Sequence, residues 1–151
     1  MFPYYEIGNI EDFKASPAIL NSLLGQVILA YLQMFDKIGL IHRDLTPGNV
    51  VVDHIDYPRI FYQYSDIIYE VITHGYRAII IDFGNSLIKM NDRKDRELEW
   101  RVGVELLYFI EQVCRIKKIH PDLINLIRSN KIKSIPDLLN TAIQFNLISI
   151  E

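Results

Sequence analysis

Two polar clusters, each next to short apolar runs, constrain the fold of this chain more than any other feature. The first, at residues 41–52, reads Ile-His-Arg-Asp-Leu-Thr-Pro-Gly-Asn-Val-Val-Val. The second, at residues 79–84, reads Ile-Ile-Ile-Asp-Phe-Gly. A short apolar run beside Gly, Pro or Asn is typical of a buried strand. The sequence therefore predicts two polar loops that a small sheet carries.

Together the clusters match the patterns H-R-D-L-x-x-x-N and D-F-G, and in them the sequence resembles a protein kinase. The resemblance implies that Asp44 orients the attacking hydroxyl group and that Asn49 and Asp82 hold Mg²⁺ on the phosphates of ATP. Amide and carboxylate oxygens are the hard ligands that Mg²⁺ prefers. His42 is then a structural residue that packs under the Asp-Phe-Gly turn. Thr46 replaces a lysine common in serine/threonine kinases and offers ATP only a neutral hydrogen bond.

The first 13 residues look like the hinge of the protein kinase family and the start of the helix after it. The resemblance implies that the backbone of Pro3 and Tyr5 binds the adenine ring and that Val51 forms the floor of that site. An ordinary aromatic segment that packs on the core explains residues 1–13 equally well, so both interpretations stay open.

Residues 54–77 form an insertion between the two motifs and are rich in aromatic side chains. Apolar and aromatic residues alternate on both sides of Ser65 and Asp66, which predicts an inserted β-hairpin. An insertion at this place resembles haspin-like kinases, including those of large DNA viruses. Its tyrosines either cover a small core of the insertion itself, the favoured interpretation, or form a surface for a partner.

Helices are predicted over much of the remaining chain. Ser16 and Pro17 are typical of a helix start, and Gly39 is placed to end that helix. Between them, apolar residues recur at every third or fourth position from Ile19 to Phe35, which indicates a wide buried face. The same reasoning predicts three further helices, around residues 98–113, 121–128 and 134–145.

The resemblance also gives the expected fold. We expect one domain over residues 1–151 with the α+β fold of a protein-kinase-like C-terminal lobe, mainly α-helical, in which a small β-sheet carries the catalytic and metal loops. The N-terminal lobe is expected to be absent, because the sequence has no G-x-G-x-x-G and its only lysines before Asp44 are Lys14 and Lys37. No Ala-Pro-Glu follows Gly84, so regulation by a phosphorylated activation loop is not expected.

Composition narrows the classes of partner. Half of the 151 residues are hydrophobic and the net charge is −3, which indicates a globular chain without a reason to bind nucleic acid. The single Cys114 excludes an internal disulfide and fits a reducing, cytoplasmic location, in a host cell if the source is a virus. Asn21, Gln26 and Gln33 interrupt the longest apolar stretch, so we expect a core helix there and no membrane span.

Two classes of function are compatible with these observations. The first, which the motifs favour, is an enzyme: a protein kinase catalytic lobe that transfers phosphate from Mg-ATP to a serine or threonine hydroxyl of a protein substrate and is incomplete without a small lobe. The second is a catalytically inactive, kinase-like binding module that acts through a partner. A separately encoded small lobe or self-association is expected to cover an exposed apolar face. A small-molecule phosphotransferase ranks third.

Overall fold

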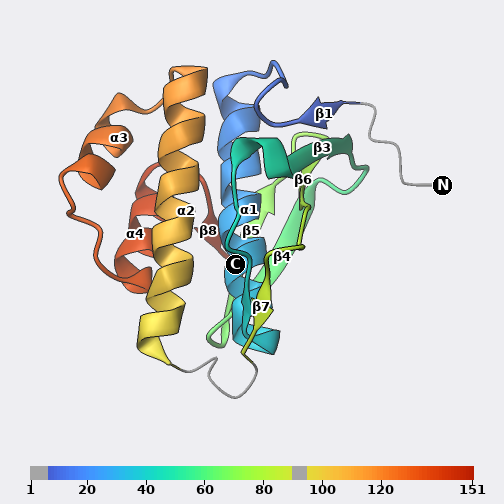
Figure 1. Cartoon of the computed structure of the whole chain (residues 1–151). Coiled ribbons are helices and arrows are strands. Elements are labelled where there is room, and N and C mark those ends of the chain that lie inside the picture. Colours follow the sequence, from blue (N-terminus) through green and yellow to red (C-terminus); the bar gives the residue numbers. More distant parts are fainter. Residues whose placement is uncertain (1–6, 90–94) are drawn as a thin grey trace.

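The computed structural model describes residues 7–89 and 95–151. Within these ranges the chain forms four α-helices and one short 3₁₀ helix. The helices are α1 (Pro17–Ile38), α2 (Arg96–Lys117), α3 (Pro121–Arg128) and α4 (Ile135–Gln144), and the 3₁₀ helix spans Pro47–Asn49. Figure 1 shows α1 and α2 side by side at the centre of the molecule, with α3 and α4 on one flank and most strands on the other.

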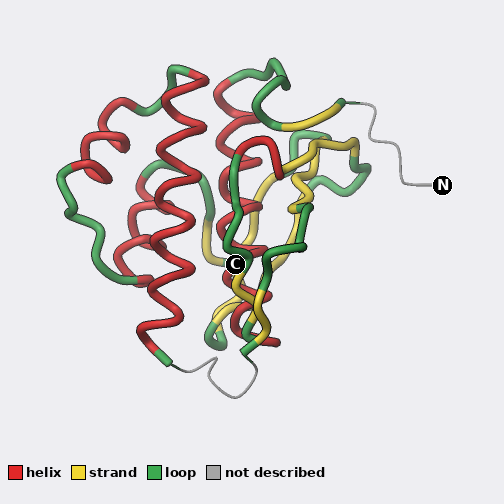
Figure 2. The backbone as a smooth tube through the Cα atoms, in the orientation of Figure 1, coloured by secondary structure: helices red, strands yellow, loops and turns green. Residues whose placement is uncertain are grey.

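Eight strands are present in the same described ranges. They are β1 (Gly8–Asn9), β2 (Leu40–Ile41), β3 (Val50–His54), β4 (Arg59–Tyr64), β5 (Ile67–Ile72), β6 (Tyr76–Ile80), β7 (Leu87–Ile88) and β8 (Ser149–Ile150). They form three small antiparallel sheets, with strand orders β1-β3-β6, β2-β7 and β4-β5-β8. Figure 2 shows most of these short strands beside α1, on the side away from α2.

Helix α1 begins and ends where the sequence predicts. The hydroxyl of Ser16 accepts a hydrogen bond from the Ile19 N–H at 3.4 Å, and Pro17 occupies the first turn, where its missing N–H costs nothing. Gly39 ends the helix in the left-handed conformation, with φ 68°, and its N–H donates to the Phe35 carbonyl. The predicted limits of this helix are confirmed.

The same helix is the centre of the core. It packs against α2 and against strands of all three sheets. By length and composition α1 could also cross a membrane, but 67% of its most apolar window is buried inside the fold. Its apolar face is therefore covered by the chain's own strands and helices, as in a core helix.

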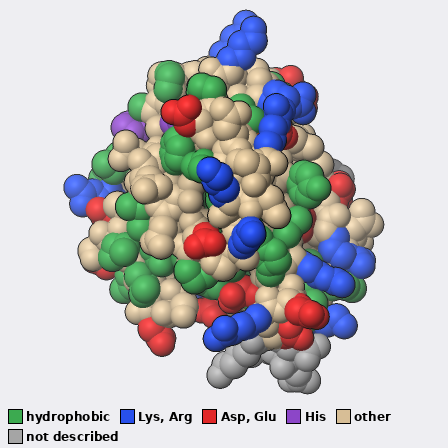
Figure 3. Space-filling model, turned by 90° about the vertical axis from the view of Figure 1, so that its left-hand side faces the viewer, with side chains coloured by type: hydrophobic (Ala, Val, Ile, Leu, Met, Phe, Trp, Pro, Cys, Tyr) green, Lys and Arg blue, Asp and Glu red, His purple; other side chains and the backbone are tan. Residues whose placement is uncertain are grey.

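The C-terminal part of the chain adds three helices on one side of α1. Asp95 caps α2 by accepting from the Glu97 N–H at 2.8 Å, and Ser134 caps α4 by accepting from the Asp137 N–H at 3.2 Å. Figure 3 views the side that carries α3 and α4, where positive and negative side chains are interspersed. On this side the described residues thus present a mixed, solvated surface.

The segment 54–77 contains a β-hairpin, as the alternation predicts. β4 and β5 pair over their whole length, and the turn residues Ser65 and Asp66 have φ values of 49° and 65°. Two consecutive residues with positive φ match the twist of the flanking strands. The hairpin is not a separate core, however, because three of its tyrosines are buried in the main core of the protein: Tyr62, Tyr64 and Tyr69.

The expected fold class is wrong. In place of a mainly helical lobe with one small sheet, the described residues form four helices and three small antiparallel sheets, which does not resemble a mainly helical kinase C-terminal lobe. The physical reason lies in the hairpin. It packs against α1, and β5 also pairs with β8 near the C-terminus, so the insertion builds a third sheet into the body of the protein.

Candidate functional site

The two polar clusters lie together at one end of the β3–β6 pair. The Ile81 N–H, directly before Asp82, donates to the Asn49 carbonyl at 2.9 Å. The register continues with Val50 opposite Ile80. Because β3 starts right after Asn49 and β6 ends just before Asp82, antiparallel pairing brings the two loops to the same edge of the sheet.

Asn49 holds the loop that contains Asp44. Its Nδ2 group donates to the Asp44 carbonyl at 2.8 Å and to the Asp44 carboxylate at 3.3 Å. Both bonds use the amide nitrogen, and within residues 7–89 and 95–151 no donor bonds the Oδ1 atom. The amide oxygen, which is the atom that can bind a hard cation, is therefore left available.

His42 joins the two loops from beneath. Its ring is buried, Nε2 lies 2.8 Å from the Ile81 carbonyl, and the Asp44 N–H donates to Nδ1 at 3.1 Å. A nitrogen that accepts an N–H carries no proton, so the ring is the neutral tautomer with its hydrogen on Nε2. The ring edge also packs against Phe83, with centroids 5.0 Å apart. Its role is therefore structural.

Glu105 is a site residue that the sequence analysis missed. From the middle of α2, its carboxylate accepts hydrogen bonds from the backbone N–H groups of Arg43 at 3.2 Å and Leu45 at 2.9 Å, and from the Tyr31 hydroxyl at 2.6 Å. The Tyr31 oxygen in turn accepts from the His42 N–H at 2.8 Å. One carboxylate thus fixes the backbone on both sides of Asp44.

The protonation states in this network are consistent with its geometry. Burial, together with the hydrogen bond to Glu105, raises the pKa of the Tyr31 hydroxyl, which keeps it protonated as a donor. The Glu105 carboxylate also lies 3.9 Å from Nδ1 of His42. That contact is not an ion pair, because Nδ1 already accepts the Asp44 N–H.

A signal for Glu105 exists in the sequence. The position falls on the apolar face of α2, between Val102 and Phe109 at helical spacing. An acidic residue on a buried helix face needs hydrogen-bond donors. Which donors they are depends on the packing of α2 against residues 43–45, and the sequence does not contain that information.

Two residues of the site have unusual backbone conformations. Arg43 and Asp82 have φ values of 69° and 63°, in the left-handed region that residues other than glycine rarely adopt. Each costs about 1–2 kcal/mol relative to the right-handed region. Such strain persists only where surrounding bonds impose it, and it is concentrated at functional sites. Here Arg43 directly precedes Asp44, and Asp82 directly precedes Phe83.

The remaining predicted nucleotide contacts are less directly supported. Pro3 and Tyr5 lie outside the described residues. Val51 is 7% exposed and pairs with Asn9 and Ile79 at the centre of its sheet. Thr46 lies in the same loop as Asp44, half-buried, where its carbonyl accepts the N–H that closes the 3₁₀ turn.

Two residues of the site carry oxygen atoms of the kind that Mg²⁺ prefers. Asp82 offers an exposed carboxylate and Asn49 an amide oxygen, and Mg²⁺ typically binds one or two such groups together with substrate phosphates and water. The described residues contain no group of three His, Cys, Asp or Glu side chains that could hold a metal. A magnesium site here would therefore depend on phosphate oxygens for its other ligands.

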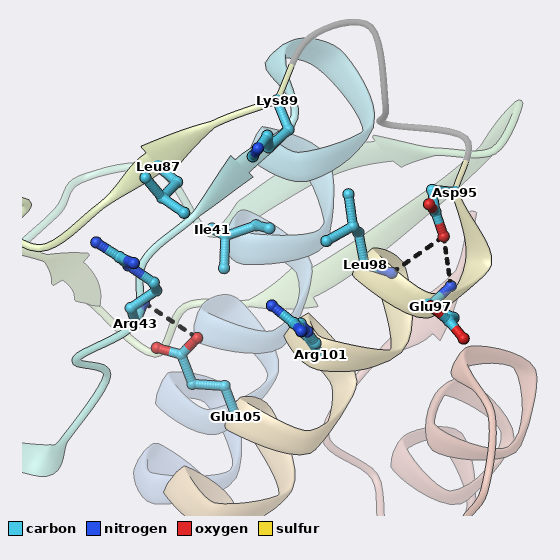
Figure 4. Close-up of a pocket in the computed structure, with 9 residues that line it drawn as sticks. All are labelled: Ile41, Arg43, Leu87, Lys89, Asp95, Glu97, Leu98, Arg101 and Glu105. Atoms are coloured by element: carbon cyan, nitrogen blue, oxygen red, sulfur yellow. Dashed lines mark hydrogen bonds between the residues drawn. The ribbon is translucent and has the colours of Figure 1, made fainter.

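A hollow of about 460 Å³ lies on the Arg43 side of the loop (Figure 4). Figure 4 shows Arg43 and Arg101 beside the Glu105 carboxylate. The lining carries three cations and three carboxylates, so the hollow does not favour a ligand of either charge. Nε of Arg43 donates to the Asn85 carbonyl at 2.5 Å, which ties the first loop to the segment after Gly84.

Comparison with known proteins gives little information about function. No family model matches the chain. The chain is 38% identical over 82 residues to a protein of Invertebrate iridescent virus 6 with the name Uncharacterized protein 098R. The match covers 51% of this chain and 14% of the viral protein, so the chain corresponds to a small part of that relative.

Proposed function

We propose that this chain carries the phosphoryl-transfer residues of a protein serine/threonine kinase that uses Mg-ATP. The observation that carries the proposal is the bond network around Asn49. Its side chain holds Asp44 and its carbonyl accepts the N–H that precedes Asp82, so the three motif residues lie in two adjoining, mutually bonded loops. An ordinary polar turn between two strands would not require these hydrogen bonds between the motif residues.

Each residue has a distinct role in the proposed reaction. The Asp44 carboxylate accepts a hydrogen bond from the substrate hydroxyl and orients it toward the terminal phosphate. Asn49 and Asp82 hold Mg²⁺, which, when bound, neutralises charge on the phosphates. His42 and Glu105 do not touch the substrate. They keep the two loops in register through the Ile81 carbonyl and the backbone on either side of Asp44.

The proposal includes a second polypeptide segment. The 151 residues contain no glycine-rich loop, and such a loop and its associated lysine normally cover and position the phosphates. Much of the rate enhancement in phosphoryl transfer comes from that positioning. We therefore expect Mg-nucleotide binding by this chain and full activity only together with a segment that supplies those groups.

Thermal unfolding with ATP tests the nucleotide site directly. With Mg²⁺ and ATP at ten times the dissociation constant, linkage predicts about 1.4 kcal/mol of stabilisation and a melting temperature about 3–5 °C higher. Asp82→Asn is expected to abolish the part of the shift that depends on Mg²⁺. Asp56→Asn is the matched control, since Asp56 is exposed in the loop between β3 and β4.

The second candidate function is a non-catalytic binding module. The observation that favours it is the exposure of Phe83, which is 41% accessible beside an apolar groove. A kinase-like site without its own phosphate-covering loop can serve as a docking surface. Absence of any magnesium-dependent shift at millimolar ATP contradicts the enzyme proposal and leaves this one.

A further inference from the structure

A second surface, independent of the phosphoryl-transfer residues, has the features of a peptide-binding site. It is a groove of about 570 Å³ between β4 and β6, floored by α1. Most of its lining is apolar, and it is open to solvent at Tyr57, Phe61 and Phe83. The strands contribute two runs of lining residues, 59–61 and 77–80.

The groove follows the edges of the strands. Successive residues of a strand point to opposite faces of its sheet. Three consecutive residues of β4 and four consecutive residues of β6 line the groove. A hollow over one face would touch alternate residues, so contact with consecutive residues places this groove along the strand edges.

The hydrogen-bond pattern shows which backbone groups of β6 point into the groove. Ile81 donates to the Asn49 carbonyl and the Ile55 N–H donates to Gly75, so the odd-numbered residues of β6 face β3. The N–H and carbonyl groups of Ala78 and Ile80 therefore point away from β3. Within the described ranges, the Ala78 N–H bonds Gln26, and no hydrogen bond occupies the Ala78 carbonyl or the Ile80 N–H.

The facing edge of β4 is open in the same way. The Thr73 N–H donates to the Pro58 carbonyl, and with the register of the pair this means that the backbone N–H and carbonyl groups of the even-numbered β4 residues point toward β5. The backbone groups of Arg59 and Phe61 are consequently directed outward. In the part of the chain that the structure describes, the outward backbone N–H and carbonyl groups of Arg59 and Phe61 have no hydrogen bond.

Helix α1 closes these edges along part of their length and leaves them open at the groove. Gln26 bonds the Tyr76 carbonyl and the Ala78 N–H, and Gln33 accepts from the Gln63 N–H. Between these two glutamines the helix presents Ala30, which lines the groove and has no hydrogen-bonding side chain. The apolar floor and the unbonded strand edges therefore coincide.

The charge of the groove indicates the chemistry of its ligand. The lining residues include Arg59 and Arg77 and no carboxylate. The side chains of Arg59 and Arg77 are 56% and 45% exposed, and their surface ion pairs with Glu70 and Asp53 are of the weak, exchangeable kind. A ligand with carboxylates can therefore engage both arginines.

We propose that this groove binds an extended, acidic and apolar segment of another protein, which adds a strand to the open edge of β6 or β4. Main-chain hydrogen bonds supply affinity, alternate apolar side chains fill the hollow beside Phe83, and carboxylates reach Arg59 and Arg77. An exposed strand edge is a template for such pairing. The inference does not depend on the proposed phosphoryl transfer, and it specifies a ligand for the groove on which the second candidate function rests.

Selection from a phage-displayed library of random 12-residue peptides on the folded chain provides the probe. We expect enriched peptides with apolar residues at alternate positions and at least one carboxylate. The double variant Arg59→Glu/Arg77→Glu should bind a synthetic copy of the selected peptide with an affinity at least tenfold lower than that of the parent chain. Arg115→Glu is the matched control, because Arg115 is an equally exposed arginine in a surface pair with Glu111. Circular dichroism checks that each variant is folded.

N-methylation of the peptide tests strand addition without any change to the protein. Only alternate N–H groups of a strand face its neighbour. Methylation of the peptide N–H groups at one set of alternate positions should abolish binding, and methylation at the other set should have little effect. In a separate measurement, the unmethylated peptide should slow hydrogen exchange at the backbone amide of Ile80 or Phe61. Absence of enriched peptides, or equal effects of the two methylated sets, overturns the proposal. A dimer in sedimentation equilibrium that Arg59→Glu/Arg77→Glu dissolves assigns the groove to a second copy and also overturns it.

Discussion

The backbone N–H of Ala78 donates to the side-chain oxygen of Gln26 at 2.7 Å, so a helix side chain takes the place of a neighbouring strand at the edge of β6. The nitrogen of the same amide donates to the Tyr76 carbonyl at 3.0 Å and to the Ser22 hydroxyl at 3.0 Å. Gln26 is 1% exposed and has both ends of its amide bonded. This pairing attaches α1 to the sheet that carries the candidate site.

Replacement of Gln26 by leucine should lower the free energy of unfolding by about 2 kcal/mol, because it leaves the Ala78 N–H and the Tyr76 carbonyl without partners. Gln33→Leu is the matched control on the same helix, since Gln33 is half-buried and makes one such bond, to the Gln63 N–H. We expect that control to cost less than about 1 kcal/mol. Urea denaturation measures both values, and equal losses would contradict the larger contribution that we assign to the buried, doubly bonded Gln26.

Glu105→Gln should destabilise the protein by about 2–3 kcal/mol, because hydrogen bonds to a carboxylate are stronger than those to an amide. The amide can present its oxygen to one of the Arg43 and Leu45 N–H groups, and its NH₂ group then opposes the other. Glu111→Gln, on the same helix, removes surface ion pairs with two arginines and should cost less than about 1 kcal/mol. Chemical denaturation distinguishes the two, and a loss as small as that of the control argues against the anchoring role.

The parts of the fold that could be predicted are those with local causes. The Ser16 cap, Gly39 and the apolar spacing between them define α1 in the sequence itself, and the alternation around Ser65 and Asp66 defines the hairpin. The sequence also indicated that Asp44 and Asn49 share one short loop, although the hydrogen bond between them was not predicted. In each case the interaction partners lie close together along the chain.

The parts that could not be predicted depend on contacts between distant segments. β8 pairs with β5 across 80 residues, and its two residues have no periodicity of their own, so the third sheet was not foreseen. In the sequence Gln26 is only an interruption of an apolar stretch, and its bonds to β6 become visible once α1 is packed on the sheet. Glu105 is a similar case, since its partners are backbone groups.

Gly25 is predicted to be intolerant of any side chain. A Cβ atom there would lie 1.8 Å from the Leu147 carbonyl oxygen, a backbone atom that cannot move without shifting the segment before β8. Gly25→Ala should therefore cost about 3 kcal/mol in stability, despite the better helix propensity of alanine. Gly48→Ala is the matched control, because its Cβ would meet only the Thr46 hydroxyl at 3.8 Å. If a thermal melt shows equal losses of stability for the two variants, the close contact between Gly25 and the Leu147 carbonyl is contradicted.

The stability of the protein should also fall as the pH decreases from 7.5 to 5.5, in part because of His120. Burial lowers the pKa of His120 below its ordinary value, and Nε2 lies 2.5 Å from the side-chain oxygen of Asn21, a contact that either a neutral or a charged ring can make. Above about pH 6.5 neither the folded nor the unfolded chain holds the proton. Below that pH the unfolded chain takes it up first, so acid favours unfolding until the folded pKa is passed.

His120→Asn should flatten this dependence, since asparagine tolerates the left-handed conformation of this residue, which has φ 50°, and has no charge to gain. His54→Gln is the control, because His54 is exposed. Urea denaturation at pH 7.5, 6.5 and 5.5 gives the unfolding free energy of each protein. We expect the loss of unfolding free energy between pH 7.5 and pH 5.5 to be smaller for His120→Asn than for the parent chain. For His54→Gln we expect the same loss as for the parent chain. A slope that both substitutions reduce equally would mean that titration of histidines in the unfolded chain, and not the burial of His120, causes the acid sensitivity.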